Sequence, residues 1–176
     1  MEIVQAETPQ HLEHIRALFR EYFQWVTADH GIDLGYQKVE GELAALPGCY
    51  APPRGRLLLA LDGEKPAGCI AIRPLEEDGV CELKRMYVRP EYHGQGLGKT
   101  LAQTVLQEAR GIGYRLVRLD TADSMTPAQR LYASLGFRRA KPYYDAPPDI
   151  SQRAIFMELR LGDLRHAGDH GSPQPG

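Results

Sequence analysis

The sequence predicts an α+β fold with α/β/α layers, in which about seven strands form a mixed, mostly antiparallel sheet flanked by about four helices. Three observations carry this prediction. Apolar residues recur at helical spacing from Leu12 to Val26, apolar runs alternate with turns between residues 56 and 88, and a glycine-rich turn at 94–98 opens another amphipathic segment. A chain of 176 residues can bury one core. We therefore expect one domain over residues 1–161, followed by a disordered tail over residues 162–176, which are rich in Gly, His, Asp and Pro.

The N-terminal part predicts a short strand and two helices. Residues 2–7 alternate as a strand does, and Thr8-Pro9 then supplies an N-cap followed by proline at the first helical position. The stretch from Gly31 to Gly35 interrupts the apolar stripe. A second, weaker helix is expected over residues 37–46.

The middle of the chain predicts an antiparallel meander. Residues 56–61 and 66–73 are apolar runs joined by a tight turn at Asp62-Gly63. A further turn at Asp78-Gly79 leads into a third strand over residues 80–88. Three strands that follow one another in this way favour antiparallel neighbours.

The remaining segments alternate between helix and strand. The helix after the glycine-rich turn carries Leu97, Leu101, Val105 and Ala109 on one face and is expected to end at Gly111. The later elements are, in order, a strand over 115–120, a helix started by a capping box at Thr126-Pro127-Ala128-Gln129 and running to Leu135, and strands over 137–142 and 153–161.

Composition and charge exclude several classes of protein. The formal net charge is −2, from 21 basic and 23 acidic residues, so no field strong enough to gather nucleic acid or anionic lipid is expected. The N-terminus lacks a basic region followed by an apolar one, and no apolar run approaches membrane-spanning length. We therefore expect a soluble, cytoplasmic protein with no nucleic-acid or membrane partner.

The cysteines and histidines predict neither a disulfide nor a metal site. Cys49, Cys69 and Cys81 are odd in number and never spaced as C-x-x-C, and their mostly apolar surroundings are typical of buried thiols. The six histidines show no H-E-x-x-H pattern and no pairing with cysteine at ligand spacing.

The glycine-rich turn, His93-Gly94-Gln95-Gly96-Leu97-Gly98-Lys99-Thr100, is expected to bind a phosphate or pyrophosphate. It joins a strand to a helix, so the first N–H groups of that helix lack intrahelical partners and lie at its positive end. The nucleotide-hydrolase P-loop does not fit, because its required first glycine falls on His93. The dinucleotide-binding fingerprint does not fit either, because its third glycine falls on Lys99.

Two motifs resemble the GNAT (Gcn5-related N-acetyltransferase) family. The pattern [Q/R]-x-x-G-x-[G/A] maps onto residues 93–98, with His93 where Gln or Arg is usual. The pattern A-x-x-L-Y-x-x-x-G-F maps onto residues 128–137. The family often has Asn three residues before that alanine, in contact with the pantetheine arm, and this chain has Met125 there. The order of elements matches the family over nearly the whole chain.

The resemblance implies acetyl-coenzyme A as the acetyl donor and no metal. The pantetheine is expected to pair with the main chain near residues 86–88, and the pyrophosphate to bind at the glycine-rich turn. The expected binding residues are Met86, Tyr87, Val88, His93, Gly94, Gln95, Gly96, Leu97, Gly98, Lys99 and Thr100.

The resemblance also implies an N-acetyltransferase that passes the acetyl group directly to a primary amine in a ternary complex. Tyr132 is expected to protonate the coenzyme A thiolate, and the N–H of Val88 to stabilise the oxyanion. Glu82 occupies the position of the family's usual base, although a strand glutamate is equally often a solvated residue or the partner of a cation. A covalent acyl-enzyme is a minor alternative, because Cys81 and Cys49 have no evident histidine partner.

The acceptor is expected to be a small-molecule amine. In this family acceptor choice lies in the first helix pair, the loop near 46–55 and the late loop at 142–148, where Tyr143, Tyr144 and Asp145 suggest an aromatic and acidic rim.

Two other classes of function stay open at this point. One is a non-catalytic, coenzyme A-binding sensory or regulatory module. The other is a homodimer formed through the late strands, which exposure of Phe156 or Met157 would support.

Overall fold

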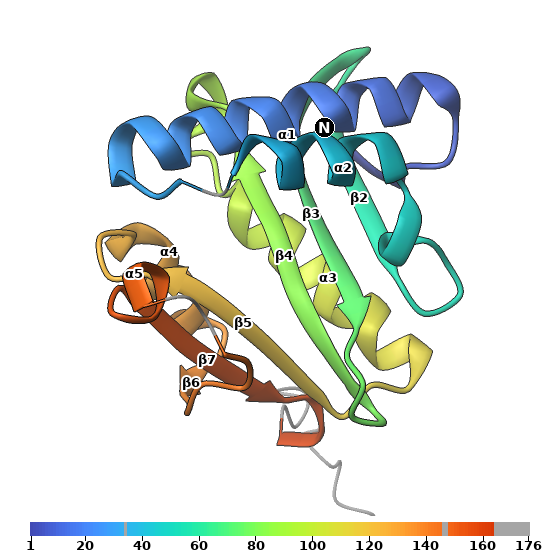
Figure 1. Cartoon of the computed structure of the whole chain (residues 1–176). Helices are drawn as coiled ribbons and strands as arrows, with labels where there is room; N and C mark the ends of the chain where they lie inside the picture. The colour runs from blue at the N-terminus through green and yellow to red at the C-terminus, as the bar shows by residue number, and fades with distance from the viewer. Residues whose placement is uncertain (34, 146–147, 164–176) are drawn as a thin grey trace, which may run out of the picture.

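The fold is a seven-stranded mixed sheet between layers of helices (Figure 1). The computed structural model describes residues 1–33, 35–145 and 148–163. The strands are β1 (Glu2–Gln5), β2 (Arg56–Asp62), β3 (Lys65–Pro74), β4 (Val80–Val88), β5 (Leu116–Ala122), β6 (Arg138–Arg139) and β7 (Ala154–Arg160). The helices are α1 (Pro9–His30), α2 (Tyr36–Ala45), α3 (Leu97–Ile112), α4 (Thr126–Ser134) and α5 (Pro148–Ser151).

The strands lie in the order β1-β2-β3-β4-β5-β7-β6. Only β4 and β5 pair in parallel, and all other neighbours pair in antiparallel fashion. The predicted α+β class, with its mixed, mostly antiparallel sheet, is therefore confirmed. The short helix α5 is an addition that the sequence analysis did not anticipate.

Alternation along the central strands builds a core on each face of the sheet. In β2, Leu58 and Ala60 belong to the core under α3, whereas Leu57 and Leu59 belong to the core under α1 and α2. All four side chains are buried. This is the arrangement that a strand with period-two side chains requires when helices cover both of its faces.

The ends of α1 follow the predicted signals. The Thr8 hydroxyl accepts a hydrogen bond from the His11 N–H at 3.1 Å, and Pro9 is the first helical residue. Gly31 ends the helix in the left-handed region, with φ of 62°.

Several local predictions were wrong. Helix α3 ends at Gly113, with φ of 102°, rather than at Gly111. Thr126 forms no capping box, because α4 has no side-chain cap and the Gln129 amide donates to the Ala122 carbonyl at 2.8 Å instead. Cys49 is exposed, whereas Cys69 and Cys81 are buried as expected.

The late part of the chain also differs from its prediction. The expected strand over 137–142 is reduced to Arg138–Arg139. Phe156 and Met157 are buried, with exposed fractions of 5% and 4%, so the feature that would have supported a dimer surface there is missing. Of the expected tail, residues 164–176 lie outside the described residues.

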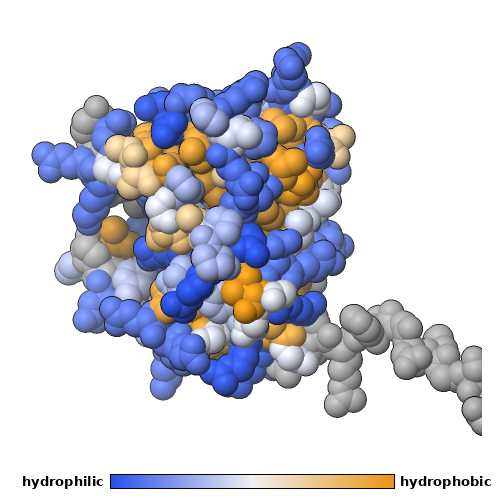
Figure 2. Space-filling model, turned by 90° about the vertical axis from the view of Figure 1, so that its right-hand side faces the viewer, coloured by the Kyte–Doolittle hydropathy of each residue, from blue (hydrophilic) through white to orange (hydrophobic). Residues whose placement is uncertain are grey.

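The surface facing the right of Figure 1 carries hydrophobic residues in several patches that hydrophilic residues separate (Figure 2). A large continuous apolar patch would be typical of a protein interface. This face therefore gives no support to a docking surface.

Candidate active site

A pocket of about 750 Å³ opens where β4 and β5 separate. The two strands pair only at their beginnings, from Val80 to Glu82 on β4 and from Leu116 to Arg118 on β5. Beyond that point they diverge (Figure 1), and residues 83–88 and 120–122 line the pocket. The β4 edge therefore faces the pocket with main-chain groups that β5 does not pair.

A bulge in β4 accompanies this divergence. Tyr87 pairs with Cys69 and Lys84 pairs with Ala71, so one additional residue is accommodated on the β4 side. Arg85 lies in this bulge with φ of 57°, a backbone conformation that residues other than glycine seldom adopt.

The Arg85 side chain is fixed by its neighbours in α1 and α2. It donates to both Glu42 oxygens, from Nε at 2.8 Å and from Nη2 at 2.6 Å, and it stacks on the Phe23 ring with 4.9 Å to the centroid. A two-pronged contact of this kind is strong and directional. It couples the bulge to α2.

The glycine-rich turn forms one end of the pocket. Gly94 and Gly96 have φ of 73° and 79°, in the left-handed region that glycine accepts without strain. The first backbone hydrogen bond of α3 runs from the Thr100 N–H to the Gly96 carbonyl at 3.0 Å. The N–H groups of residues 97–99 precede that bond, so they have no intrahelical acceptor and lie at the positive end of the helix dipole.

Side chains of the turn tie it to its surroundings. His93 donates from Nε2 to the Val88 carbonyl at 2.8 Å and so links the turn to the end of β4. Gln95 and Thr100 do not line the pocket, because their side chains donate to the carbonyls of Glu91 and Gly96. The remaining predicted residues do line it, namely Met86, Tyr87, Val88, His93, Gly94, Gly96, Leu97, Gly98 and Lys99. We call this part of the pocket, residues 86–88, 93–94 and 96–99, the turn end.

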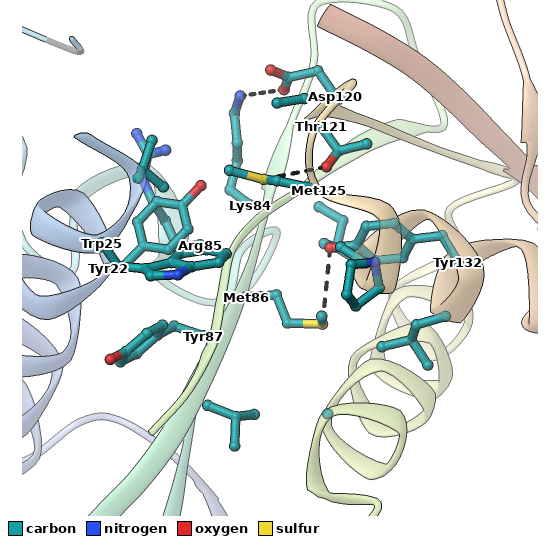
Figure 3. A pocket seen from close by; sticks show the side chains of 18 of the residues that line it. Tyr22, Trp25, Lys84, Arg85, Met86, Tyr87, Asp120, Thr121, Met125 and Tyr132 are labelled. Carbon is teal, nitrogen blue, oxygen red and sulfur yellow. Dashed lines mark hydrogen bonds and ion pairs between the residues drawn. The ribbon is translucent and has the colours of Figure 1, made fainter. Parts of the chain in front are cut away.

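Tyr132 reaches the pocket from α4 (Figure 3). Its side chain is buried, with the hydroxyl 3.8 Å from the Met86 sulfur. Burial raises the pKa of Tyr132. The phenol is therefore protonated at neutral pH and can act as a proton donor.

Glu82 does not line the pocket, contrary to what a direct base requires. Its side chain is buried, and both oxygens already have partners. Arg73 donates to Oε2 at 2.6 Å, and Oε1 lies 2.8 Å from the Tyr143 hydroxyl and 3.1 Å from the Lys84 nitrogen. Side chains of the protein therefore occupy both oxygens of Glu82.

Asp120 is the carboxylate that does line the pocket, and the sequence analysis missed it. Lys84 donates to its Oδ1 at 2.8 Å and the Tyr144 hydroxyl to its Oδ2 at 3.1 Å. Burial would raise the pKa of Asp120, but the charge and hydrogen bond of Lys84 outweigh it and hold the pKa below its ordinary value. The position of Asp120, where the apolar pattern of its strand ends, was the available signal.

The opposite end of the pocket combines aromatic and apolar side chains with two charged ones. Tyr22 and Trp25 come from α1 and face Met86 and Tyr132 across the space (Figure 3). We call the part of the pocket formed by Tyr22, Trp25, Ile32, Asp120 and Arg153 the α1 end. Of the late-loop residues that the sequence singled out, Tyr144 lines the pocket, whereas Tyr143 and Asp145 do not.

The cysteines do not support a covalent route. None of the three lines the pocket. Burial raises the pKa of Cys81 to about 12, which keeps it a thiol at neutral pH.

Residues 1–33, 35–145 and 148–163 contain no group of three or more His, Cys, Asp or Glu side chains placed to hold a metal ion. None of the helices in these ranges is both long and apolar enough to cross a membrane.

Comparisons with known proteins agree on one family. The model of the Acetyltransferase (GNAT) family matches residues 12–137. An uncharacterized N-acetyltransferase of Schizosaccharomyces pombe is 41% identical over 155 residues, covering 87% of this chain and 90% of the relative. The N-acetylaspartate synthetase of Homo sapiens is 36% identical over 131 residues, covering 70% of this chain but only 43% of that relative.

A solved structure extends the likeness in fold. The PaiA N-acetyltransferase of Thermoplasma acidophilum, determined in complex with coenzyme A, superposes with a TM-score of 0.66 at 21% identity. The match covers 91% of this chain and 99% of the other. At that identity the likeness concerns the arrangement of elements.

Proposed function

The chain belongs to the GNAT family of acetyltransferases, and from this premise we propose that it moves the acetyl group of acetyl-coenzyme A directly onto the primary amine of a small molecule. The observation that carries the proposal is the single pocket that joins the glycine turn, the unpaired β4 edge and the Tyr132 hydroxyl. We further propose that residues 1–161 form the catalytic domain. A non-catalytic coenzyme A sensor is not favoured, because a buried proton donor faces this space.

The turn end would hold the donor. The N–H groups of residues 97–99 would bind the pyrophosphate, helped by the dipole of α3 and by the positive charge of Lys99. The pantetheine would pair with the β4 edge at residues 86–88, which β5 leaves unpaired. These contacts come mainly from the backbone.

Transfer would proceed by direct attack of the amine. The neutral amine nitrogen bonds to the thioester carbon, the oxyanion receives a hydrogen bond from the Val88 N–H, and the C–S bond then breaks. Tyr132 gives its proton to the departing thiolate. The nitrogen loses a proton to become the amide, and this proton restores the Tyr132 phenol, so the neutral amine and acetyl-coenzyme A give the acetylated amine and coenzyme A.

We propose Asp120, in place of Glu82, as the carboxylate that takes a proton from the acceptor, directly or through water. A free primary amine has a pKa of about 10 and is mostly protonated at neutral pH. Asp120 lines the pocket and is ionised, so it can attract the ammonium group and then assist its deprotonation. Glu82 would act indirectly by holding Lys84.

The acceptor would be amino acid-like. The N-acetylaspartate synthetases among the relatives support a small molecule that carries an amine, although this chain spans less than half of their length. The pocket supports the same view, because its lining includes the apolar side chains of Trp25 and Ile32 as well as the carboxylate of Asp120.

The test is an acetyl-transfer assay with purified protein. Acetyl-coenzyme A would be incubated with a panel of amines and amino acids, with thiol release as the signal and mass spectrometry to identify the product. We expect at least one amine to be acetylated and the signal to fall in Tyr132→Phe. Thiol release that does not depend on any amine in the panel would overturn the proposal.

A further inference from the structure

The four cations of the pocket differ in how far the protein already neutralises them. Arg85 is held by both oxygens of Glu42, and Lys84 lies between two carboxylates at 2.8 and 3.1 Å. Lys99 belongs to the turn end. Arg153, at the α1 end, is less closely held by carboxylates than Arg85 and Lys84 are.

Arg153 has only distant partners among the described residues. Its Nε lies 3.5 Å from an Asp123 oxygen, and its Nη2 lies 3.5 Å from the Ser124 hydroxyl. Good hydrogen bonds of this kind measure about 2.7–3.2 Å. The side chain is 36% exposed, and it lines the pocket. A guanidinium in this state can bind a carboxylate of a ligand through two parallel hydrogen bonds.

The fold places Arg153 at a useful distance from the reacting groups. Ala154 pairs with Ala122 on β5, and the Asp123 N–H donates to the Arg153 carbonyl at 2.8 Å. Arg153 is therefore level with Asp123, about 10 Å along the strand from Asp120 at roughly 3.4 Å per residue. Arg153 and Asp120 line the same pocket, so one ligand could contact both charges.

The pocket-lining residues near Arg153 in the sequence are apolar. Ile150 and Ala154 flank it in sequence and line the pocket, as do Trp25 and Ile32 from the α1 side. A second carboxylate on the ligand would face these apolar groups and lose its hydration without a partner, which is costly.

We propose that the acceptor is an α-amino acid with an apolar or aromatic side chain, whose carboxylate binds Arg153. This inference rests on the proposed function and deepens it. The amine would lie between Asp120 and Tyr132, and the side chain would pack on Trp25 and Ile32. Arg153 thereby determines specificity, and an acidic amino acid such as aspartate is disfavoured.

Binding can be measured without turnover, because Trp25 is the only tryptophan of the chain and lines the pocket. Its fluorescence would be titrated in the presence of coenzyme A with pairs that differ only in the carboxylate: phenylalanine with phenethylamine, and leucine with 3-methylbutylamine. In the unmodified protein we expect each amino acid to bind about 10- to 100-fold more tightly than its amine, as a charged hydrogen-bonded pair implies.

Three variants make this test specific. Arg153→Met should remove the preference for the amino acid and leave the binding of the amine unchanged, whereas Arg153→Lys should restore part of the preference. Arg138→Met, which removes an exposed arginine of β6 outside the pocket, should behave as the unmodified protein. Thermal melting of each variant would show that the fold is retained.

The proposal would be overturned if amine and amino acid bound equally, if Arg153→Met weakened both alike, if aspartate bound as tightly as phenylalanine, or if none of these ligands changed the fluorescence. Acetylation of other amines with no amino-acid binding would leave the proposed function standing and reject this inference. Amino-acid binding with no acetyl transfer would reject the proposed function and leave Arg153 only as a carboxylate-binding residue.

Discussion

The turn end of the pocket presents main chain, whereas the α1 end presents side chains from distant segments. At the turn end, residues 86–88, 93–94 and 96–99 lie close together in the sequence, and the glycine conformations leave the backbone accessible. At the α1 end, Trp25, Asp120 and Arg153 come from a helix and two strand ends that are far apart in the chain. A donor common to a family needs only the first kind of site, while a particular acceptor needs the second.

Tyr132 lies between the two ends, and its removal should have the largest effect. In Tyr132→Phe we expect kcat to fall by about 10²-fold or more, the range of a lost general acid, with acetyl-coenzyme A affinity nearly unchanged. Steady-state kinetics and calorimetric titration would measure the two quantities. Tyr114→Phe is the matched control, since it removes a buried hydroxyl that donates to the Arg54 carbonyl outside the pocket. A full rate in Tyr132→Phe would remove this residue from the mechanism.

Gly96→Trp tests the turn end alone. The indole would stand at the start of α3, where φ is 79° and the pyrophosphate is expected, so acetyl-coenzyme A affinity should fall by about 50-fold or more. The fold should persist, because nothing lies within 4 Å of an added Cβ. The measurement is a thermal-shift titration with acetyl-coenzyme A.

Gly63→Trp provides the control for that variant. Gly63 also has a positive φ, of 61°, with open space around it, but it lies in the β2–β3 turn away from the pocket. Both variants should therefore carry similar backbone strain. Unaltered acetyl-coenzyme A affinity in Gly96→Trp would refute the assigned donor site.

Lys84→Met addresses the α1 end through the charge of Asp120. Lys84 lowers the pKa of Asp120 in the native protein, so this carboxylate stays ionised well below neutral pH. In Lys84→Met the pKa of Asp120 should rise, because burial still raises it and the charge of Lys84 no longer lowers it. The acidic limb of the kcat/KM profile should move to higher pH, with a loss of about tenfold at low pH. Lys65→Met, at an exposed lysine in the hairpin, should leave the profile in place. A profile in Lys84→Met that matches the native one would exclude Asp120 as the proton acceptor.

The contrast between the two ends also explains what the sequence could predict. The glycine turn and the Ala128–Phe137 segment are local patterns, and the family resemblance follows from them, while the apolar runs and turns predict the sheet. The sequence alone could not place Asp120 and Arg153 in the pocket, because only the separation of β4 and β5 and the pairing of β5 with β7 bring them there. Glu82 has the strand position of a base, but its contacts with Arg73, Lys84 and Tyr143 and its absence from the pocket lining could be seen only in the structure.

The smallest expected effect concerns Gly111, a glycine that the conformation of α3 does not require. Gly111 lies within α3 rather than at its end, and nothing lies within 4 Å of an added Cβ there. Gly111→Ala should therefore raise the free energy of unfolding by about 0.5–1 kcal/mol, because alanine has less backbone freedom to lose on folding. Gly96→Ala should lower it by about 1 kcal/mol, because an L residue is strained at φ of 79°. Urea denaturation would measure both values. If both variants changed the free energy of unfolding in the same direction, the left-handed conformation assigned to the turn would be wrong.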